Sequence, residues 1–339
     1  MSKAVENVNP LFGRFDDMLK SALRVPAKAG LGNFWGNRKK LTFVDMFCGI
    51  GGFHEAARQL GMECVFACDI DADCRKAYEE NYEFRPESDI RRIDVASIPD
   101  HDVLCAGFPC QPFSIIGDRA GFADVRGTLF FELAKIIKAK QPPAFILENV
   151  KQLASHNKGE TLRRILEILR GLDYIVDYRI LNALHFGLPQ KRERILIVGF
   201  KHEIEGFEWP IRRIPMIPLC EILEETPDRK HYVSDRIKRS RMAEHKAKLK
   251  PAIWHENKGG NVASHPFSCA LRAGASYNYL LVDGERRLTP RELLRLQGFP
   301  ETFKIVGTDG QIRKQAGNSV PVPMVKSVLE SVQDARRAE

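Results

Sequence analysis

The sequence lacks the features that mark several classes of protein. No run approaches the ~18 consecutive apolar residues of a membrane span, and the mean hydropathy is −0.28. The first twenty residues do not show the basic and then apolar pattern of a signal peptide. Internal repeats and low-complexity tracts are also absent from the sequence. We therefore expect neither a membrane span nor an export signal, and we expect a cytoplasmic location.

Cysteine is present, but not in the patterns that bind a metal or form the disulfide bonds of a small secreted fold. The eight cysteines form no Cys-x-x-Cys pair and have no paired histidines beside them. Cys64, Cys68 and Cys74 lie in a segment that has the pattern of a strand followed by a helix, which argues against a zinc site. Reduced thiols and no bound metal are the expectation.

Acidic residues are outnumbered by basic ones. The 339 residues include 52 Lys and Arg against 44 Asp and Glu, a net charge of +8. The excess is concentrated in residues 1–40, with a net charge of +5, and in residues 226–250, with +6. Clustered positive charge can neutralise phosphates, which makes nucleic acid a candidate partner. Two solvated basic faces would explain the same clusters.

The order of apolar segments predicts an α/β fold. Short β-rich runs at 41–47, 63–69, 102–107, 144–150, 174–181 and 194–200 alternate with helical periodicity at 53–61, 72–82, 129–140 and 160–172. This alternation is typical of a doubly wound, parallel-rich Rossmann-like sheet. The pattern stops near residue 200, and helices resume at 289–298 and after Pro321 and Pro323. We therefore predict an extension (1–40), a first domain (41–200), a smaller irregular domain (201–285) and a C-terminal segment (286–339).

The turn after the first predicted strand indicates a nucleoside-containing cofactor. Phe47 is followed by Cys48 and by Gly49-Ile50-Gly51-Gly52 at the start of a predicted helix, and Asp69 ends the second strand about twenty residues later. Glycines let a ligand approach the backbone, and an acid at this spacing can bind a ribose diol. The alternative is a tight turn followed by an acid that precedes the next helix.

A cysteine and a glutamate follow the third and fourth strands. Cys110 lies between Pro109 and Pro112 in a loop at the predicted carboxyl edge of the sheet, where a nucleophile would be well placed. Glu148 ends an apolar strand, where a carboxylate usually has a task or a partner. A small buried cysteine and a paired structural carboxylate are the alternatives.

Two arginines precede the last strand of the first domain. Arg192 and Arg194 are alternate residues of an extended segment, so they are expected to project from the same face. They could orient a base or a phosphate, or they could form a solvated edge of the sheet.

Taken jointly, these segments resemble the DNA (cytosine-5) methyltransferases, in particular the compact bacterial modification enzymes. The family's motifs occur in the family's order as FVDMFCGIGGF, GFPCQPFSIIG, RGTLFFEL, LENV, QKRERILIVGF, RRLTPRELLRLQGFP and QAGNSVPVPM. The resemblance covers residues 41 to about 200 and about 286 to 330. It implies an S-adenosylmethionine-dependent enzyme that acts on a cytosine flipped out of duplex DNA, with residues 201–285 as the target-recognition domain.

The resemblance also implies roles for individual residues. Cys110 would add to carbon 6 of cytosine, Glu148 would hold the exocyclic amine and nitrogen 3, and Arg192 and Arg194 would position the base. The implied contacts of S-adenosylmethionine are Phe47, Gly49, Ile50, Gly51, Gly52, Asp69, Ile70, Asp89, Ile90, Pro109, Leu129, Asn318 and Ser319. Because Asn318 and Ser319 belong to this site, the C-terminal helix is expected to return to the first domain.

The implied partners are double-stranded DNA and a cognate restriction endonuclease that acts at the same site, and the expected state is a monomer at the nucleoid. The basic stretch from Arg229 to Lys250 would contact phosphates. The chain has Ala270-Leu271 where family members often have Thr-Leu, and Ile116 offers no polar group to fill the gap left by the flipped base.

Two other functions compete with this one. A transfer-RNA cytosine methyltransferase would use the same core, but the Cys-Phe-Thr motif of that branch is absent from the sequence. A catalytically silent DNA-binding relative would not need Cys110, Glu148 and Arg192, which are all present.

Overall fold

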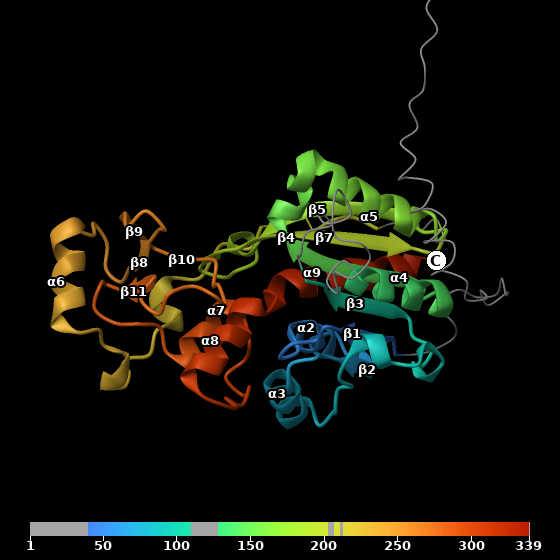
Figure 1. Ribbon diagram of the computed structural model, residues 1–339, viewed down its shortest axis with the longest axis horizontal. Helices are drawn as coiled ribbons and strands as arrows, with labels where there is room; N and C mark the ends of the chain where they lie inside the picture. The colour runs from blue at the N-terminus through green and yellow to red at the C-terminus, as the bar shows by residue number, and fades with distance from the viewer. Residues whose placement is uncertain (1–39, 110–127, 203–206, 211–212, 339) are drawn as a thin grey trace, which may run out of the picture.

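The computed structural model describes residues 40–109, 128–202, 207–210 and 213–338 (Figure 1). The extension 1–39, Cys110 and Ile116 lie outside the described residues. Within the described part of the chain, no helix is both long and apolar enough to cross a membrane.

A six-stranded sheet forms the centre of the first domain. The strand order is β2-β1-β3-β4-β7-β5. The neighbours from β2 to β4 are parallel, whereas β7 runs antiparallel to both β4 and β5. The strands are β1 (Thr42–Met46), β2 (Glu63–Cys68), β3 (Val103–Gly107), β4 (Ala144–Val150), β5 (Ile175–Asn182) and β7 (Glu193–Phe200). The predicted doubly wound, parallel-rich sheet is confirmed, with one reversed strand.

Helices cover both faces of this sheet. One face packs on α2 (Gly52–Gln59), α3 (Ala72–Tyr82) and α9 (Val322–Ala338), and the other packs on α4 (Thr128–Lys140) and α5 (Glu160–Arg170). Neighbouring strand residues therefore belong to different cores: Phe43 faces the first set of helices and Val44 the second. Burial on both faces explains why the central strands are continuous apolar runs without polar alternation.

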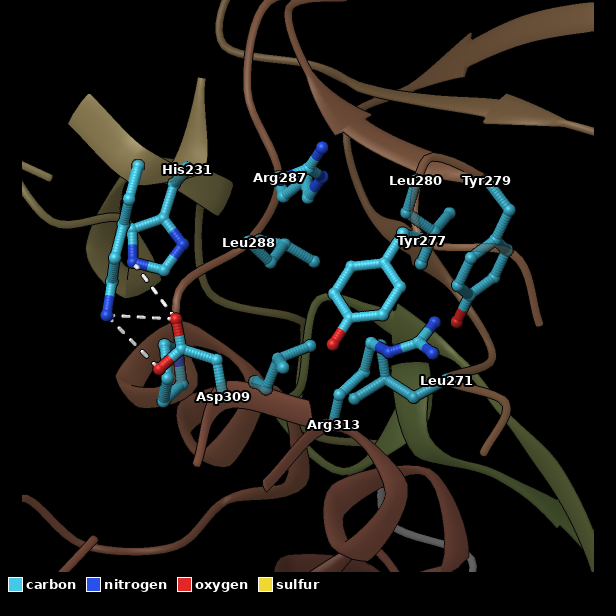
Figure 2. Close-up of a pocket in the computed structure, with 12 residues that line it drawn as sticks. His231, Leu271, Tyr277, Tyr279, Leu280, Arg287, Leu288, Asp309 and Arg313 are labelled. Atoms are coloured by element: carbon cyan, nitrogen blue, oxygen red, sulfur yellow. Dashed lines mark hydrogen bonds and ion pairs between the residues drawn. The ribbon is translucent and has the colours of Figure 1, made fainter. Parts of the chain in front are cut away.

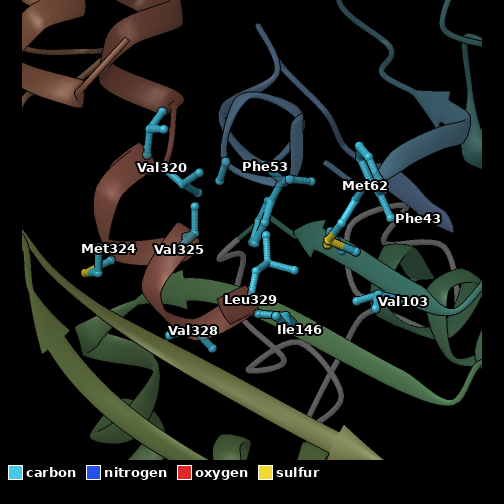
Figure 3. Packing of buried hydrophobic residues seen from close by; sticks show 14 of the residues in the cluster. Phe43, Phe53, Met62, Val103, Ile146, Val320, Met324, Val325, Val328 and Leu329 are labelled. Carbon is cyan, nitrogen blue, oxygen red and sulfur yellow. The ribbon is translucent and has the colours of Figure 1, made fainter. Parts of the chain in front are cut away.

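The last helix, α9, packs against α2 on the first of these faces (Figure 3). Its inward side chains Val325, Val328, Leu329 and Val332 are fully buried and follow the spacing of one helical face. Figure 3 shows Val325 and Leu329 beside Phe53 of α2. The end of the chain is thereby part of the core that begins with β1.

A second, smaller unit projects from one end of the sheet (Figure 1). It contains a three-stranded sheet in the order β11-β8-β9, the helices α6, α7 and α8, and a short parallel pairing of β10 with β6. Its elements are β6 (Gln190–Lys191), α6 (Asp235–Glu244), β8 (Ile253–Glu256), β9 (Val262–His265), β10 (Ser268–Cys269), β11 (Leu280–Val282), α7 (Pro290–Gln297) and α8 (Asp309–Asn318).

Helix α7 joins the two units. Leu293 and Leu296 pack in the core of the second unit, whereas Leu294 packs in the core of the first. The helix starts at a capping box, in which Thr289 accepts from the backbone of Glu292 and the Glu292 side chain accepts from the backbone of Thr289. The segment 286–318 thus forms the junction, and only α9 lies wholly on the first unit.

Candidate active site

A cleft of about 640 Å³ opens at the carboxyl ends of β1 to β4, the edge at which open α/β folds bind ligands. The end of α8 also lines it, through Lys314, Gly317 and Asn318. Its lining includes these predicted site residues: Phe47, Gly49, Asp69, Ile70, Asp89, Ile90, Pro109, Leu129, Glu148, Arg192, Arg194 and Asn318. Segments that are distant in the sequence therefore meet at one site.

The glycines of the first turn divide into two kinds. Gly49 has a φ of +54°, and a Cβ added to it would meet nothing within 4 Å, so its backbone is open to the cleft. A Cβ on Gly51 would lie 2.3 Å from the ring of Tyr82, and one on Gly52 would lie 2.7 Å from Val320. The first glycine is thus suited to ligand approach, and the other two permit close packing beneath the turn.

Four predicted cofactor residues are not part of the described lining of this cleft. Ile50 is buried in the core, and Gly51 and Gly52 pack as above. The hydroxyl of Ser319 is directed at the carbonyl of Val320, at 3.4 Å. The pattern of the turn was visible in the sequence, but the direction of each residue depended on the helices packed behind it.

Asp69 holds the shape of the turn. Its Oδ2 accepts from the backbone N–H of Gly49 at 2.8 Å, and its Oδ1 accepts from that of Asp71 at 2.8 Å. Burial raises the pKa of Asp69, and these two backbone donors oppose that effect. Asp89 also lines the cleft, and the Arg91 guanidinium lowers its pKa. Two acidic side chains therefore line the edge that the resemblance assigns to the cofactor.

Glu148 and Arg194 form a buried ion pair at the centre of the site. Arg194 Nε lies 2.8 Å from Glu148 Oε1, and both side chains are about one-tenth exposed. In the antiparallel register Glu148 is opposite Leu196, so Arg194 is a diagonal neighbour on the same face. Burial raises the pKa of Glu148, and the charges of Arg194 and Arg192 oppose this. The carboxyl group is thus held in place and shifted toward its protonated form.

The start of the cysteine loop is fixed beside this pair. Gly107, the last residue of β3, is paired with Glu148. The side-chain amide of Asn149 donates to the carbonyl of Phe108 at 2.9 Å. Cys110 itself is outside the described residues, so its distance from Glu148 stays a prediction. The described residues before the cysteine loop end at Pro109, which lines the same cleft.

Arg192 makes contacts that differ from those expected of it. It is 1% exposed. Its terminal nitrogens donate to the carbonyls of Leu271 at 2.8 Å, Gly317 at 2.9 Å and Ser319 at 2.6 Å. The two arginines do border one cleft, but only Arg194 pairs with the carboxylate. Arg192 ties the second unit and the end of α8 to the first domain.

Sequence reasoning missed several residues that shape the site. Asn149, Asp71 and Lys314 line the cleft, and Gln190 joins the units by accepting from the backbone N–H of Leu271 at 3.1 Å. A signal for Asp71 was available, because an Asp between a strand and a helix is a typical N-cap. Nothing in the sequence around Lys314 distinguishes it from other surface lysines.

The second unit contains a smaller cavity of about 110 Å³ (Figure 2). In it the Arg313 guanidinium lies 4.1 Å from the centre of the Tyr277 ring, and Lys230 pairs with Asp309 at 3.0 Å. Part of the charge of the basic stretch is therefore paired with an acid of the same chain, although both side chains remain exposed. Lys238 and Arg241 likewise pair, with Glu285 and Glu256 respectively.

No group of described residues has the composition of a metal site with three or more His, Cys, Asp or Glu ligands. The sheet topology, the glycine turn and the cleft define a Rossmann-like methyltransferase with an added smaller unit. More particularly, the chain belongs to the C-5 cytosine-specific DNA methylase family, whose model matches residues 41–334.

Comparison with known proteins agrees with this assignment. The chain is 53% identical to the Type II methyltransferase M.NgoBI of Neisseria gonorrhoeae, over 84% of this chain and 90% of that protein. It is 48% identical to the Type II methyltransferase M.HaeII of Haemophilus aegyptius, over 87% and 93%. The methyltransferase EhMeth of Entamoeba histolytica has a similar structure, with a TM-score of 0.66 over 88% of this chain and 99% of that one. At 16% identity, that likeness shows the fold alone.

Proposed function

We propose that this protein is the modification enzyme of a Type II system, which methylates carbon 5 of one cytosine within a specific duplex sequence and uses S-adenosylmethionine as donor. The observation that carries the proposal is the buried Glu148–Arg194 pair beside the start of the cysteine loop. A carboxyl group shifted toward its protonated form by burial suits proton donation to a ring nitrogen near neutral pH.

The cleft fits S-adenosylmethionine in size and in chemistry. Its volume of about 640 Å³ falls in the range of small-molecule sites. The open backbone at Gly49, the carboxylates of Asp69 and Asp89, and the apolar walls at Ile90 and Leu129 would hold the nucleoside, with Asn318 on the opposite side. When bound, the cofactor supplies an electrophilic methyl group on a sulfonium.

Carbon 5 of cytosine is a weak nucleophile until the ring is activated. The Cys110 thiolate adds to carbon 6 while Glu148 delivers a proton to nitrogen 3, so carbon 5 becomes enamine-like. After carbon 5 has gained the methyl group, it loses its proton to a base, the thiolate departs as the carbon 5–carbon 6 double bond re-forms, and nitrogen 3 returns its proton to Glu148. Arg194 keeps the Glu148 carboxyl group oriented throughout.

The base must leave the duplex to reach this cleft. Unstacking costs on the order of a few kcal/mol, which contacts from the cysteine loop and the second unit would offset. We assign base recognition to the second unit and phosphate contacts to the basic stretch from Arg229 to Lys250. The enzyme would act as a monomer on DNA in the cytoplasm, alongside an endonuclease specific for the same sequence.

Covalent trapping tests the proposal. Duplex DNA that contains 5-fluorocytosine at the target position should form a stable adduct with the wild-type protein in the presence of S-adenosylmethionine. Cys110→Ala should form none, and Cys110→Ser should bind DNA but lose most methylation. Bisulfite sequencing of DNA from expressing cells would identify the site.

The competing functions give different outcomes. Methyl label incorporated into transfer RNA but not into duplex DNA would contradict the proposal. Absence of an adduct with any DNA that the protein binds would indicate a silent DNA-binding relative.

A further inference from the structure

An ion pair bridges the two walls of the cleft. The Lys314 Nζ donates to Asp71 Oδ2 at 2.7 Å, across 243 positions of sequence. Asp71 lies where β2 leads into α3, and Lys314 lies on α8, four residues before Asn318. Both residues line the cleft. The pair therefore connects the edge that holds Asp69 to helix α8, whose end also lines the cleft.

The carboxylate of Asp71 is held in place by local structure. Asp71 is the N-cap of α3, and its Oδ1 accepts from the backbone N–H groups of Asp73 at 3.0 Å and Cys74 at 3.3 Å. Its own N–H donates to Asp69 Oδ1 at 2.8 Å. The second oxygen is thereby directed toward α8 with little freedom to turn away.

Helix α8 is anchored on its other side. Arg313, next to Lys314, donates to the carbonyls of Ala275 at 2.7 Å and Ser276 at 3.2 Å, and it packs on Tyr277 (Figure 2). The carbonyl of Gly317, near the end of the helix, accepts from Arg192. Lys314 therefore extends from a fixed helix, and only its side chain needs to move for the cleft to open.

The ion pair is accessible to water. The Lys314 side chain is 57% exposed and that of Asp71 is 24% exposed. Each group shifts the other's pKa toward the charged form, so both carry charge at neutral pH. Ion pairs this exposed are weak and are screened by salt, which allows repeated opening and closing.

We propose that the Asp71–Lys314 ion pair is a gate between these two parts of the cleft lining that slows release of the cofactor. The inference rests on the proposed binding of S-adenosylmethionine in this cleft. Asp71 and Lys314 act in it as positioning residues, because they hold the two walls together and take no part in the bonds that form or break.

Stopped-flow release of S-adenosylmethionine from the full-length protein tests the gate. Lys314→Met and Asp71→Asn should each raise the release rate and the dissociation constant by up to about fivefold, the upper end of the range for an exposed ion pair. In Asp71→Asn the side-chain oxygen of the new Asn can still accept from the first backbone N–H groups of α3, so the helix keeps its N-cap. The double variant should be no faster than either single variant, and Lys314→Arg should behave as wild type.

Two further readouts separate a gate from a loss of structure. Release from the wild type should accelerate between 50 and 500 mM salt, whereas release from the two charge-removing variants should respond little. The KM for the cofactor should rise without a fall in kcat. Glu301→Gln, which breaks an exposed pair with Arg295 outside the cleft, is the matched control and should leave release unchanged.

Three outcomes would overturn the inference. Weaker binding in Lys314→Met but not in Asp71→Asn would mean that the lysine contacts the cofactor directly. Wild-type release rates in both variants would show that the ion pair is not a gate, and the proposed function would be unaffected. Failure of the wild-type protein to bind S-adenosylmethionine would remove the proposed function together with the gate.

Discussion

At the scale of single residues, the site depends on a carboxyl group that the fold both buries and pairs. Glu148 lies at the end of a strand whose other residues are almost all apolar. Ionising a buried carboxylate is costly, but the Arg194 guanidinium at 2.8 Å offsets part of that cost. Because burial and the Arg194 guanidinium oppose each other, the Glu148 carboxyl group can be protonated while it stays at one fixed position in the cleft.

We predict that Glu148→Gln lowers methylation at least a hundredfold, the usual lower bound for losing a positioned proton donor. Gln has nearly the same shape, so binding of DNA and cofactor should change little. Single-turnover methylation and separate binding measurements check this. Glu193→Gln is the control, because Glu193 pairs with Lys151 and does not line the cleft. Full activity of Glu148→Gln would refute the assigned role.

A histidine beneath the glycine turn should make stability depend on pH. The ring of His54 is buried, stacks on Tyr82 with 3.9 Å between ring centres and bonds to the Tyr78 hydroxyl at 2.6 Å. Burial, with a smaller contribution from Arg58, lowers the pKa of His54 from 6.5 to about 3. Below pH 6.5 the unfolded chain therefore binds a proton that the folded chain rejects, and stability falls with falling pH.

From this shift we predict that His54 alone removes about 2 kcal/mol of unfolding free energy between pH 7 and pH 5, at ~1.4 kcal/mol per pH unit below 6.5. His54→Gln should be less stable than the wild type at pH 7. Between pH 7 and pH 5, however, its unfolding free energy should fall by about 2 kcal/mol less than that of the wild type. Urea unfolding at both pH values measures the difference. Equal losses in variant and wild type would show that the ring is protonated in the folded state.

At the scale of elements, α9 is a C-terminal helix that completes the core formed by the first helix after β1. Its buried stripe packs on α2, directly behind the turn that lines the cleft. Val320 and Ser319 can approach the backbone of Gly52 this closely only because glycine has no Cβ. The packing beneath the turn consequently depends on residues about 270 positions away.

Leu329→Ala should lower the unfolding free energy by about 2 to 5 kcal/mol, because Leu329 is 1% exposed and a cavity would remain. The exposed neighbour Glu330 is the control, and Glu330→Ala should stay within about 0.5 kcal/mol of wild type. Urea denaturation measures both. A loss as small as that of the control would show that α9 docks loosely.

At the scale of the whole molecule, one of the two concentrations of positive charge lies in the second unit, at residues 226–250, but not all of it is free to bind DNA. Lys230, Lys238 and Arg241 form ion pairs within the protein. Lys246, Lys248 and Lys250 follow α6. The phosphate contacts proposed for the stretch from Arg229 to Lys250 are therefore expected from its other basic residues, which include these three lysines.

We predict that replacing Lys246, Lys248 and Lys250 together by Gln flattens the salt dependence of DNA binding. The slope of log K against log salt should fall by about 0.9 for each phosphate that the protein no longer neutralises. Binding measured from 50 to 300 mM salt gives the slope. Replacing Lys76 and Lys304, which lie elsewhere, by Gln is the control. An unchanged slope in the triple variant would mark this stretch as a solvated face.

Most of the first domain could be predicted from the amino-acid sequence alone. The six strands and the helices between them were predictable, because burial on both faces of a sheet requires continuous apolar runs and covering helices require a 3.6-residue period. The positions of Glu148, Asp69 and Gly49 at the carboxyl edge followed from the same reasoning. Local patterns sufficed because these features depend on neighbours in the chain.

Which side chains face the cleft, and which hold it together, became clear only from the folded chain. Arg192 and Arg194 look alike in sequence, but one donates to three carbonyls of distant segments and the other pairs with Glu148. The small sheet and α6 carried no clear periodicity, and Asp71 meets Lys314 only because the fold brings α8 to the start of α3. Such contacts join residues hundreds of positions apart, and no local pattern encodes which partner a long charged side chain will reach.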